Sequence, residues 1–86
     1  MSEVLPILTL ADVETSLIAA SEEVLVLRGL AAADDLFRLG GDSLTIVRIL
    51  LTLEARLGVT LDDDVYTGGD GRIGHIARTV LERLNA

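Results

Sequence analysis

A serine and an aspartate stand side by side in the run Gly40-Gly41-Asp42-Ser43-Leu44, directly before an apolar stretch. A serine hydroxyl placed there can cap a helix, act as a nucleophile, or accept a covalently attached group. Serine is a favoured cap, worth about 0.5–2 kcal/mol over alanine, and the neighbouring aspartate could cap equally well. Capping leaves the paired glycines unexplained, because they cost chain entropy and remove side chains beside the serine. The glycines favour a hydroxyl that something large must reach.

The nucleophile hypothesis has a known pattern behind it, because residues 41–44 resemble the signature of the GDSL serine esterases. Such a serine needs a histidine base, usually three residues after an aspartate. His75 is the one histidine of the chain, and Arg72 stands three residues before it. No strand pattern precedes Ser43, as the nucleophile turn of an α/β fold requires. We interpret His75 as a helix-surface residue, and the esterase stays an alternative that turnover of a simple ester would test.

The acidic and glycine-rich stretch before the last helix predicts neither a metal site nor a phosphate-binding loop. The aspartates at 62–64 lack the alternating ligands and central glycine of a calcium loop. The glycine-rich run 68–71 is not followed by the Lys-Ser/Thr pair of a phosphate-cradling loop. The chain has no cysteine, so no thiolate binds a metal and no disulfide forms. We therefore expect a solvated acidic loop and no intrinsic metal.

The composition predicts one small domain, residues 1–86, with residues 1–8 as a disordered lead-in marked by Pro6. Half of the residues are apolar and only one Phe and one Tyr are aromatic, which suits helices better than a β-sandwich. The net charge of −7 argues against nucleic acid or an anionic membrane surface as a partner and favours basic docking surfaces. The N-terminus is acidic, and its short apolar stretch is broken by Pro6, so we predict neither a signal peptide nor a transmembrane span. We therefore expect a cytoplasmic protein.

Three stretches with a helical apolar period must position these residues, and they predict an all-α fold. The first covers about residues 10–27, with Thr9 as its cap, Asp12 in the capping-box position and Gly29 at its end. A long connection over about residues 28–42 needs apolar anchors on the core. We expect these anchors to be Leu36, Phe37 and Leu39.

The last clear helix covers about residues 72–84. Before it, Val65 and Tyr66 are predicted to form a short helical turn near residues 62–67. Three main helices and this short one would make a small four-helix bundle.

The middle helix is predicted to begin at Ser43, to run to about Leu57 and to end at Gly58. It is apolar on two sides. One stripe consists of Ile46, Ile49, Leu50, Leu53 and Leu57, and the other of Leu44, Val47 and Leu51. A domain this small can hardly surround one helix, so either the long connection covers the second stripe or the stripe is exposed for a partner.

The motif at residues 36–44, LFRLGGDSL, closely resembles the core motif of carrier proteins. More narrowly, it is similar to the thiolation (peptidyl carrier) domains of nonribosomal peptide synthetases. The acidic pair Asp34-Asp35 before the motif, residues 57–59 after the second helix, the helix order and the chain length also match. The resemblance covers about residues 10–84 and implies an acyl carrier protein-like fold.

The resemblance implies that Ser43 accepts a 4′-phosphopantetheine arm from coenzyme A, transferred by a separate phosphopantetheinyl transferase. The thiol at the end of the arm would carry an acyl or aminoacyl group as a thioester, which fits a chain without cysteine. Asp42 would help to hold magnesium and orient the arm during transfer, with Gly40, Gly41 and Leu44 around the attachment point. The residues implied to face partner enzymes are Leu44, Val47, Arg48, Leu51, Val65 and Tyr66.

Several features bear on the type of carrier. Glu54 is the only acid along the second helix, which favours the peptidyl type. The net charge of −7 favours an acyl carrier protein of polyketide or fatty-acid type, which stays an alternative. The family usually has Pro-Thr before its last helix, whereas glycines follow Thr67 here, so the docking surface near residues 62–72 departs from the pattern. A non-acylated helical adaptor, with Ser43 as a plain cap, is the alternative of another class.

The expected partners, besides the transferase, are an adenylation enzyme that loads the arm and condensation, tailoring or thioesterase enzymes of natural-product synthesis. We expect the chain itself to be a monomer and not a catalyst. Because it starts at Met1 and ends just past its last helix, we also expect a free-standing carrier.

Overall fold

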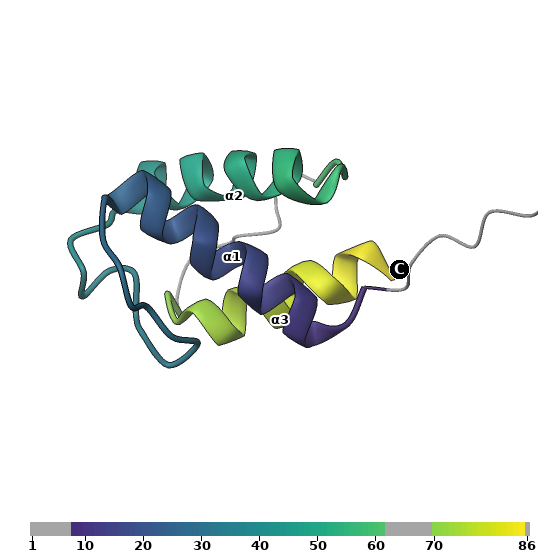
Figure 1. Cartoon of the computed structure of the whole chain (residues 1–86), viewed down its shortest axis with the longest axis horizontal. Coiled ribbons are helices and arrows are strands. Elements are labelled where there is room, and N and C mark those ends of the chain that lie inside the picture. Colours follow the sequence, from purple (N-terminus) through teal and green to yellow (C-terminus); the bar gives the residue numbers. More distant parts are fainter. Residues whose placement is uncertain (1–7, 62–69, 86) are drawn as a thin grey trace, which may run out of the picture.

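The computed structural model describes residues 8–61 and 70–85, and this part of the chain contains three helices. They are α1 (Leu10–Leu25), α2 (Ser43–Leu57) and α3 (Ile73–Leu84). None of the described residues forms a strand, so the prediction of an all-α fold is confirmed. Helix α1 packs against both α2 and α3, and it lies between them in Figure 1.

Some predicted features fall outside the described residues. The short helix expected near residues 62–67, with Val65 and Tyr66, is one of them, so the four-helix bundle stays a prediction. Of the lead-in expected over residues 1–8, only Leu8 is described, and it packs against the core. Within the described part of the chain, no helix is both long enough and apolar enough to cross a bilayer.

Helix α1 begins with the capping box that the sequence predicts. The Asp12 N–H donates to Thr9 Oγ1 at 3.1 Å, and the Thr9 N–H donates to Asp12 Oδ2 at 2.9 Å. The helix ends at Leu25, earlier than predicted, because Val26 adopts a left-handed φ of 56° and its N–H donates to the Glu22 carbonyl. A β-branched residue rarely adopts this conformation, which is why the apolar pattern places the helix end later.

The core lies among the three helices and under the connection between α1 and α2. Helix α2 points one stripe of side chains into it, as predicted, with Leu50 and Leu57 packed at its margin. Burial of a side chain of this size stabilises the fold by about 1.5–3 kcal/mol. The buried apolar residues are Val13, Leu17, Ala20, Leu36, Ile46, Ile49, Leu53, Ile73, Ile76, Ala77 and Val80.

The connection between α1 and α2 is anchored by two of the three residues expected to do so. Leu36 is fully buried and Leu39 packs partly buried against the core. Phe37 instead lies at the margin, with 36% of its surface exposed. Its ring lies against the backbone of Gly71, where any Cβ atom would overlap the ring. The connection and the segment before α3 therefore pack on each other.

Backbone hydrogen bonds tie the same connection to the start of α3. Arg72 occupies the N-cap position of α3, and its side chain makes no cap hydrogen bond. Carbonyls of the connection accept from the first N–H groups of the helix instead, which satisfies donors that the helix itself leaves unpaired. The Ile73 N–H donates to the Asp34 carbonyl at 2.9 Å and the Gly74 N–H to the Ala32 carbonyl at 2.8 Å. In the opposite direction, the Leu36 N–H of the connection donates to the Gly71 carbonyl at 2.9 Å.

Candidate functional site

Helix α2 is capped by Asp42 and not by Ser43. Asp42 has extended backbone angles, and its Oδ1 accepts from both the N–H and the Oγ1 hydroxyl of Thr45, each at 2.9 Å. The Asp42 carbonyl accepts the first hydrogen bond of the helix, from Ile46 N–H at 3.0 Å. The hypothesis that Ser43 is a plain helix cap is therefore wrong. Sequence reasoning missed Thr45, although an aspartate followed three residues later by a hydroxyl could have revealed it.

Ser43 is the first residue of α2, and its side chain is exposed. Among the described residues its hydroxyl makes no hydrogen bond, since the capping bonds belong to Asp42 and Thr45. Because the Ser43 hydroxyl is exposed and makes no hydrogen bond in the described structure, it is available for covalent chemistry. The capping hydrogen bonds of Asp42 fix the backbone directly before Ser43 and so fix the position of Ser43.

The two glycines before Asp42 are required by the backbone, each for a different reason. Gly40 has a φ of +97°, a conformation that L residues rarely adopt, and there is open space around it. Gly41 approaches the Leu36 carbonyl so closely that a Cβ atom would lie 2.9 Å from its oxygen. The Gly41 N–H also donates to that carbonyl at 2.9 Å. The glycines thus build the turn from the buried Leu36 to the cap, and the expectation that they also clear the approach to Ser43 stays a prediction.

The capping hydrogen bonds also favour a negative charge on the Asp42 carboxyl, next to Ser43. Hydrogen bonds from the Thr45 N–H and hydroxyl lower the pKa of Asp42 below its ordinary value, so the carboxylate is ionised at neutral pH. A negative charge is favourable at the N-terminus of a helix. A phosphate group attached to Ser43 would share this favourable position, while the Asp42 carboxylate would oppose it by charge.

Within the described residues no three His, Cys, Asp or Glu side chains come together as a metal site. Asp42 stands at the site as a single carboxylate, and its Oδ1 already accepts two hydrogen bonds. Magnesium prefers several oxygen ligands. A role for Asp42 in holding magnesium therefore stays a prediction that requires further ligands from a transferase and coenzyme A.

The second apolar stripe of α2 is exposed. Leu44, Val47 and Leu51 have 68%, 47% and 59% of their surfaces exposed, and Arg48 lies exposed among them. The alternative that the long connection covers this stripe is therefore wrong. The two other residues predicted to face partners, Val65 and Tyr66, lie outside the described residues.

His75 is a helix-surface residue, as predicted. Its imidazole is about half exposed on α3, with Nδ1 3.9 Å from Oδ2 of Asp70. Asp70 is held by hydrogen bonds from Arg72, which keep the pKa of that carboxyl well below its ordinary value. No hydrogen bond joins His75 to Ser43 in the described structure. The pair required by an esterase is therefore not assembled.

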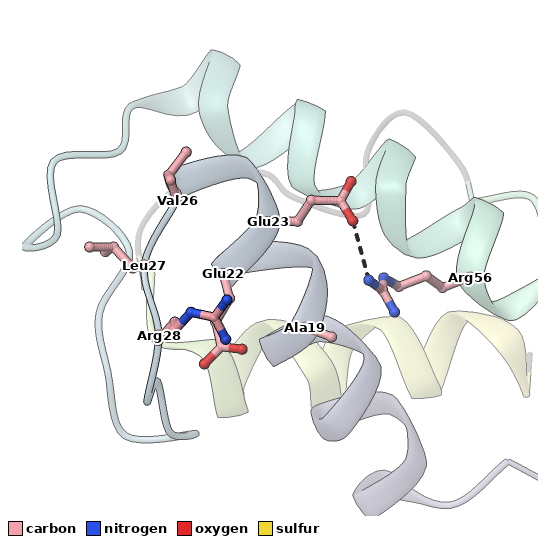
Figure 2. A pocket seen from close by; sticks show the side chains of 7 residues that line it. All are labelled: Ala19, Glu22, Glu23, Val26, Leu27, Arg28 and Arg56. Carbon is pink, nitrogen blue, oxygen red and sulfur yellow. Dashed lines mark hydrogen bonds and ion pairs between the residues drawn. The ribbon is translucent and has the colours of Figure 1, made fainter.

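A shallow hollow of about 430 Å³ lies between the end of α1 and the second half of α2 (Figure 2). Three of its charged side chains, Glu22, Glu23 and Arg56, interact with other parts of the fold. Arg56 Nη2 lies 3.2 Å from Oε1 of Glu23, and Oε2 of Glu22 accepts from the Leu30 N–H at 3.0 Å. None of residues 40–44 lines the hollow, so it is separate from the site at the start of α2.

Comparison with known proteins bears directly on this site. The model of a family described as "phosphopantetheine attachment site" matches residues 15–80, which include the turn, Asp42 and Ser43. No curated protein and no solved structure gives a significant match.

Proposed function

The chain belongs to the phosphopantetheine attachment site family, whose members are carrier proteins rather than catalysts, and from that premise we propose that Ser43 is the attachment residue. One observation supports this choice above the others: Asp42 caps α2, which leaves the exposed hydroxyl of Ser43 without a hydrogen bond in the described structure. The hydroxyl stands at the N-terminus of a 15-residue helix, where an attached phosphodiester anion is electrostatically favoured.

In the proposed modification, Ser43 Oγ forms a bond to the phosphorus of the pantetheine phosphate of coenzyme A. The pyrophosphate P–O bond breaks, adenosine 3′,5′-bisphosphate leaves, and the hydroxyl proton passes to a base of the transferase. The carrier contributes the nucleophile and its position, and Asp42 contributes a carboxylate beside it. When bound, the arm supplies a thiol that holds acyl groups as thioesters, a group that a chain without cysteine lacks.

We further propose that the carried group is an aminoacyl or peptidyl intermediate of nonribosomal peptide or related natural-product synthesis. The motif at residues 36–44 and the scarcity of carboxylates along α2 support the peptidyl type. An adenylation enzyme would load the arm, and condensation, tailoring or thioesterase enzymes would use it, in the cytoplasm where coenzyme A is available. The net charge of −7 favours a second candidate, an acyl carrier protein of polyketide or fatty-acid type.

Intact mass spectrometry tests the attachment. The wild-type chain and the Ser43→Ala and Ser16→Ala variants are incubated with coenzyme A, magnesium and a broad-specificity phosphopantetheinyl transferase, beside a known carrier as positive control. We expect the mass of one phosphopantetheine to be added to wild type and Ser16→Ala only. Modification of Ser43→Ala, or no modification of wild type while the known carrier reacts, would overturn the proposal.

A further inference from the structure

Gly71, just before the start of α3, packs on the connection that leads to Ser43. It is buried, and its φ is not positive, so the position requires the absence of a side chain and not an unusual backbone conformation. A Cβ atom added there would overlap the edge of the Phe37 ring and lie 2.9 Å from its Cε2. It would also lie 2.7 Å from Oδ1 of Asp35. We call this contact, formed by Gly71, the Phe37 ring and the Asp35 carboxylate, the Gly71 seat.

Leu36 connects the Gly71 seat to the turn before Ser43. Its N–H donates to the Gly71 carbonyl at 2.9 Å, and its own carbonyl accepts from the Gly41 N–H at 2.9 Å. Gly41 is followed by Asp42, the residue that caps α2. Because the Leu36 side chain is fully buried, the close-packed core fixes both of its peptide groups. Backbone hydrogen bonds therefore run without interruption from Gly71 through Leu36 to the residue before the cap.

Phe37 belongs to the same turn through its backbone. Its N–H donates to Oδ1 of Asp35 at 2.9 Å, and its carbonyl accepts from the Gly40 N–H at 3.1 Å. A ring pushed away from Gly71 therefore displaces a backbone that is held within the turn at both its N–H and its carbonyl. Close-packed structure transmits such a displacement to the next residues, which here lead to Ser43.

The other side of the Gly71 seat is fixed by α3. Asp35 and Arg72 form an isolated antiparallel bridge, and the Ile73 N–H is bound to the connection at the Asp34 carbonyl. Ile73 is fully buried, so the start of α3 cannot yield without disturbing the core. In Figure 1 the connection passes beside the first turn of α3 and then continues to the start of α2. A change at the Gly71 seat is therefore passed to the connection and not to α3.

We propose that Gly71 is a positioning residue for the modification of Ser43, because it lets the connection pack closely enough on α3 to place the Ser43 hydroxyl for attack on the phosphate of coenzyme A. This inference rests on the proposed function, since it takes Ser43 as the attachment residue. Gly71 acts through Phe37 and Leu36 and not on the reacting atoms themselves. Displacement of a reacting atom by about 1 Å can slow a reaction about a hundredfold, so a packing contact away from the chemistry can control its rate.

The variants that test the inference are Gly71→Ala, Phe37→Ala, the double variant of both, and Gly58→Ala as the matched control. Gly58 ends α2 at the far end from Ser43, and its φ of +67° disfavours alanine although the space around it is open. Gly58→Ala therefore destabilises the fold without contacting the Gly71 seat. One broad-specificity phosphopantetheinyl transferase and fluorescent coenzyme A give kcat and KM for each variant that thermal melts show to be folded. Amide nitrogen–proton NMR spectra report any displacement of Gly41 and Ser43.

We expect Gly71→Ala to lower kcat about ten- to a hundredfold, the range for a reacting atom displaced by up to about 1 Å, and to shift the amide signals of Gly41 and Ser43. Because Gly71 is buried, the added methyl group leaves the surface of the carrier unchanged, and KM should stay within about twofold. In the Phe37→Ala background the ring is gone, so adding Gly71→Ala should change kcat less than about threefold. Gly58→Ala should change kcat less than about twofold and leave both amide signals in place.

If Gly71→Ala is unfolded at the assay temperature, Phe37→Trp takes its place, because a larger ring crowds the Gly71 seat from the other side and should lower kcat at least about threefold. A wild-type kcat for the folded variant would overturn the inference, as would an equal loss for Gly58→Ala or a loss for Gly71→Ala that persists without the Phe37 ring. In each of these cases transfer to Ser43 would still be observed, and the proposed function would stand. If wild type itself were not modified while a known carrier was, the proposed function would fail and this inference with it.

Discussion

Replacing Gly41 with alanine tests whether the glycines before Ser43 build a turn or merely leave space for an enzyme. An alanine Cβ at this position would lie 2.9 Å from the Leu36 carbonyl oxygen and 3.4 Å from Cγ2 of Thr45. The carbonyl belongs to the backbone of a fully buried leucine, so it cannot move aside without disturbing the core. The same carbonyl accepts the Gly41 N–H at 2.9 Å, and a shift would weaken that hydrogen bond.

The expected loss follows from two opposing terms. Inserting a methyl group into close-packed structure costs about 1–3 kcal/mol. Alanine also lowers the conformational entropy of the unfolded chain, which stabilises the folded state by about 0.4–1 kcal/mol. We therefore expect Gly41→Ala to lower the free energy of unfolding by about 1.3 kcal/mol, the middle of a range of about 0–2.6 kcal/mol, measured by urea denaturation. For a domain of this size, each kcal/mol corresponds to about 4–8 °C in Tm.

Gly40 provides the matched comparison: the space around it is open, so a side chain there meets no neighbour, but its φ of +97° is one that L residues rarely adopt. We expect Gly40→Ala to be destabilised by about 1–3 kcal/mol of backbone strain, and Gly40→Asn to recover part of that loss, since asparagine tolerates positive φ better. Asparagine at 41 should give no such recovery, because its Cβ meets the same carbonyl. If Gly41→Ala left the unfolding free energy unchanged and only slowed modification by a transferase, the glycines would serve access and the turn argument would be refuted.

The other predictions concern the helix end, the cap and the two sides of α2. Val26→Gly should raise the unfolding free energy by up to about 1.5 kcal/mol, because relief of left-handed strain of about 1–2 kcal/mol offsets or exceeds the entropy cost of glycine of about 0.5–1 kcal/mol; a fall in urea stability would contradict this. The lowered pKa of Asp42 means that its ionised form stabilises the fold at pH above the ordinary value of 3.8, and that this stability is lost as the pH falls through the lower folded-state pKa. Asp42→Asn should therefore show a smaller fall of Tm between pH 6 and about 2 than wild type, and an identical fall would contradict the cap. Leu53→Ala, on the buried side of α2, should cost about 2–5 kcal/mol in urea denaturation, whereas Leu51→Ala, at a site 59% exposed, should stay within about 0.5 kcal/mol of wild type; equal losses would place the core on the wrong side of α2.

The helices could be predicted from the sequence where apolar period and cap residues agreed. Thr9 and Asp12 form the capping box expected of them, and α2 begins at Ser43 and ends at Leu57 before Gly58 as its pattern predicts. The helical period also identified the two stripes of α2, and the structure buries the first and exposes the second, which the sequence had left as one of two alternatives. These features depend on contacts within one helix or on a single period, which a sequence displays directly.

Features that depend on contacts between distant segments could not be predicted. The packing of Phe37 on Gly71 and the backbone bonds between the connection and α3 join residues more than thirty positions apart. The early end of α1 at Val26 reflects a backbone conformation that the residue type disfavours. At the site, periodicity left Ser43 and Asp42 as equal candidates for the cap, and only the hydrogen bonds from Thr45 to the Asp42 carboxylate decided between them.

The most direct test of the account locates the phosphopantetheine on the modified chain. Trypsin cuts after Arg38 and Arg48, which gives the peptide 39–48 with Ser43 and Thr45 as its only hydroxyl side chains. Tandem mass spectrometry of this peptide distinguishes the two. We predict that the modification lies on Ser43, because the Thr45 hydroxyl is bound to Asp42 and the Ser43 hydroxyl is not. Modification of Thr45, or of a serine in another peptide, would contradict the claim that the cap leaves Ser43 available for the arm.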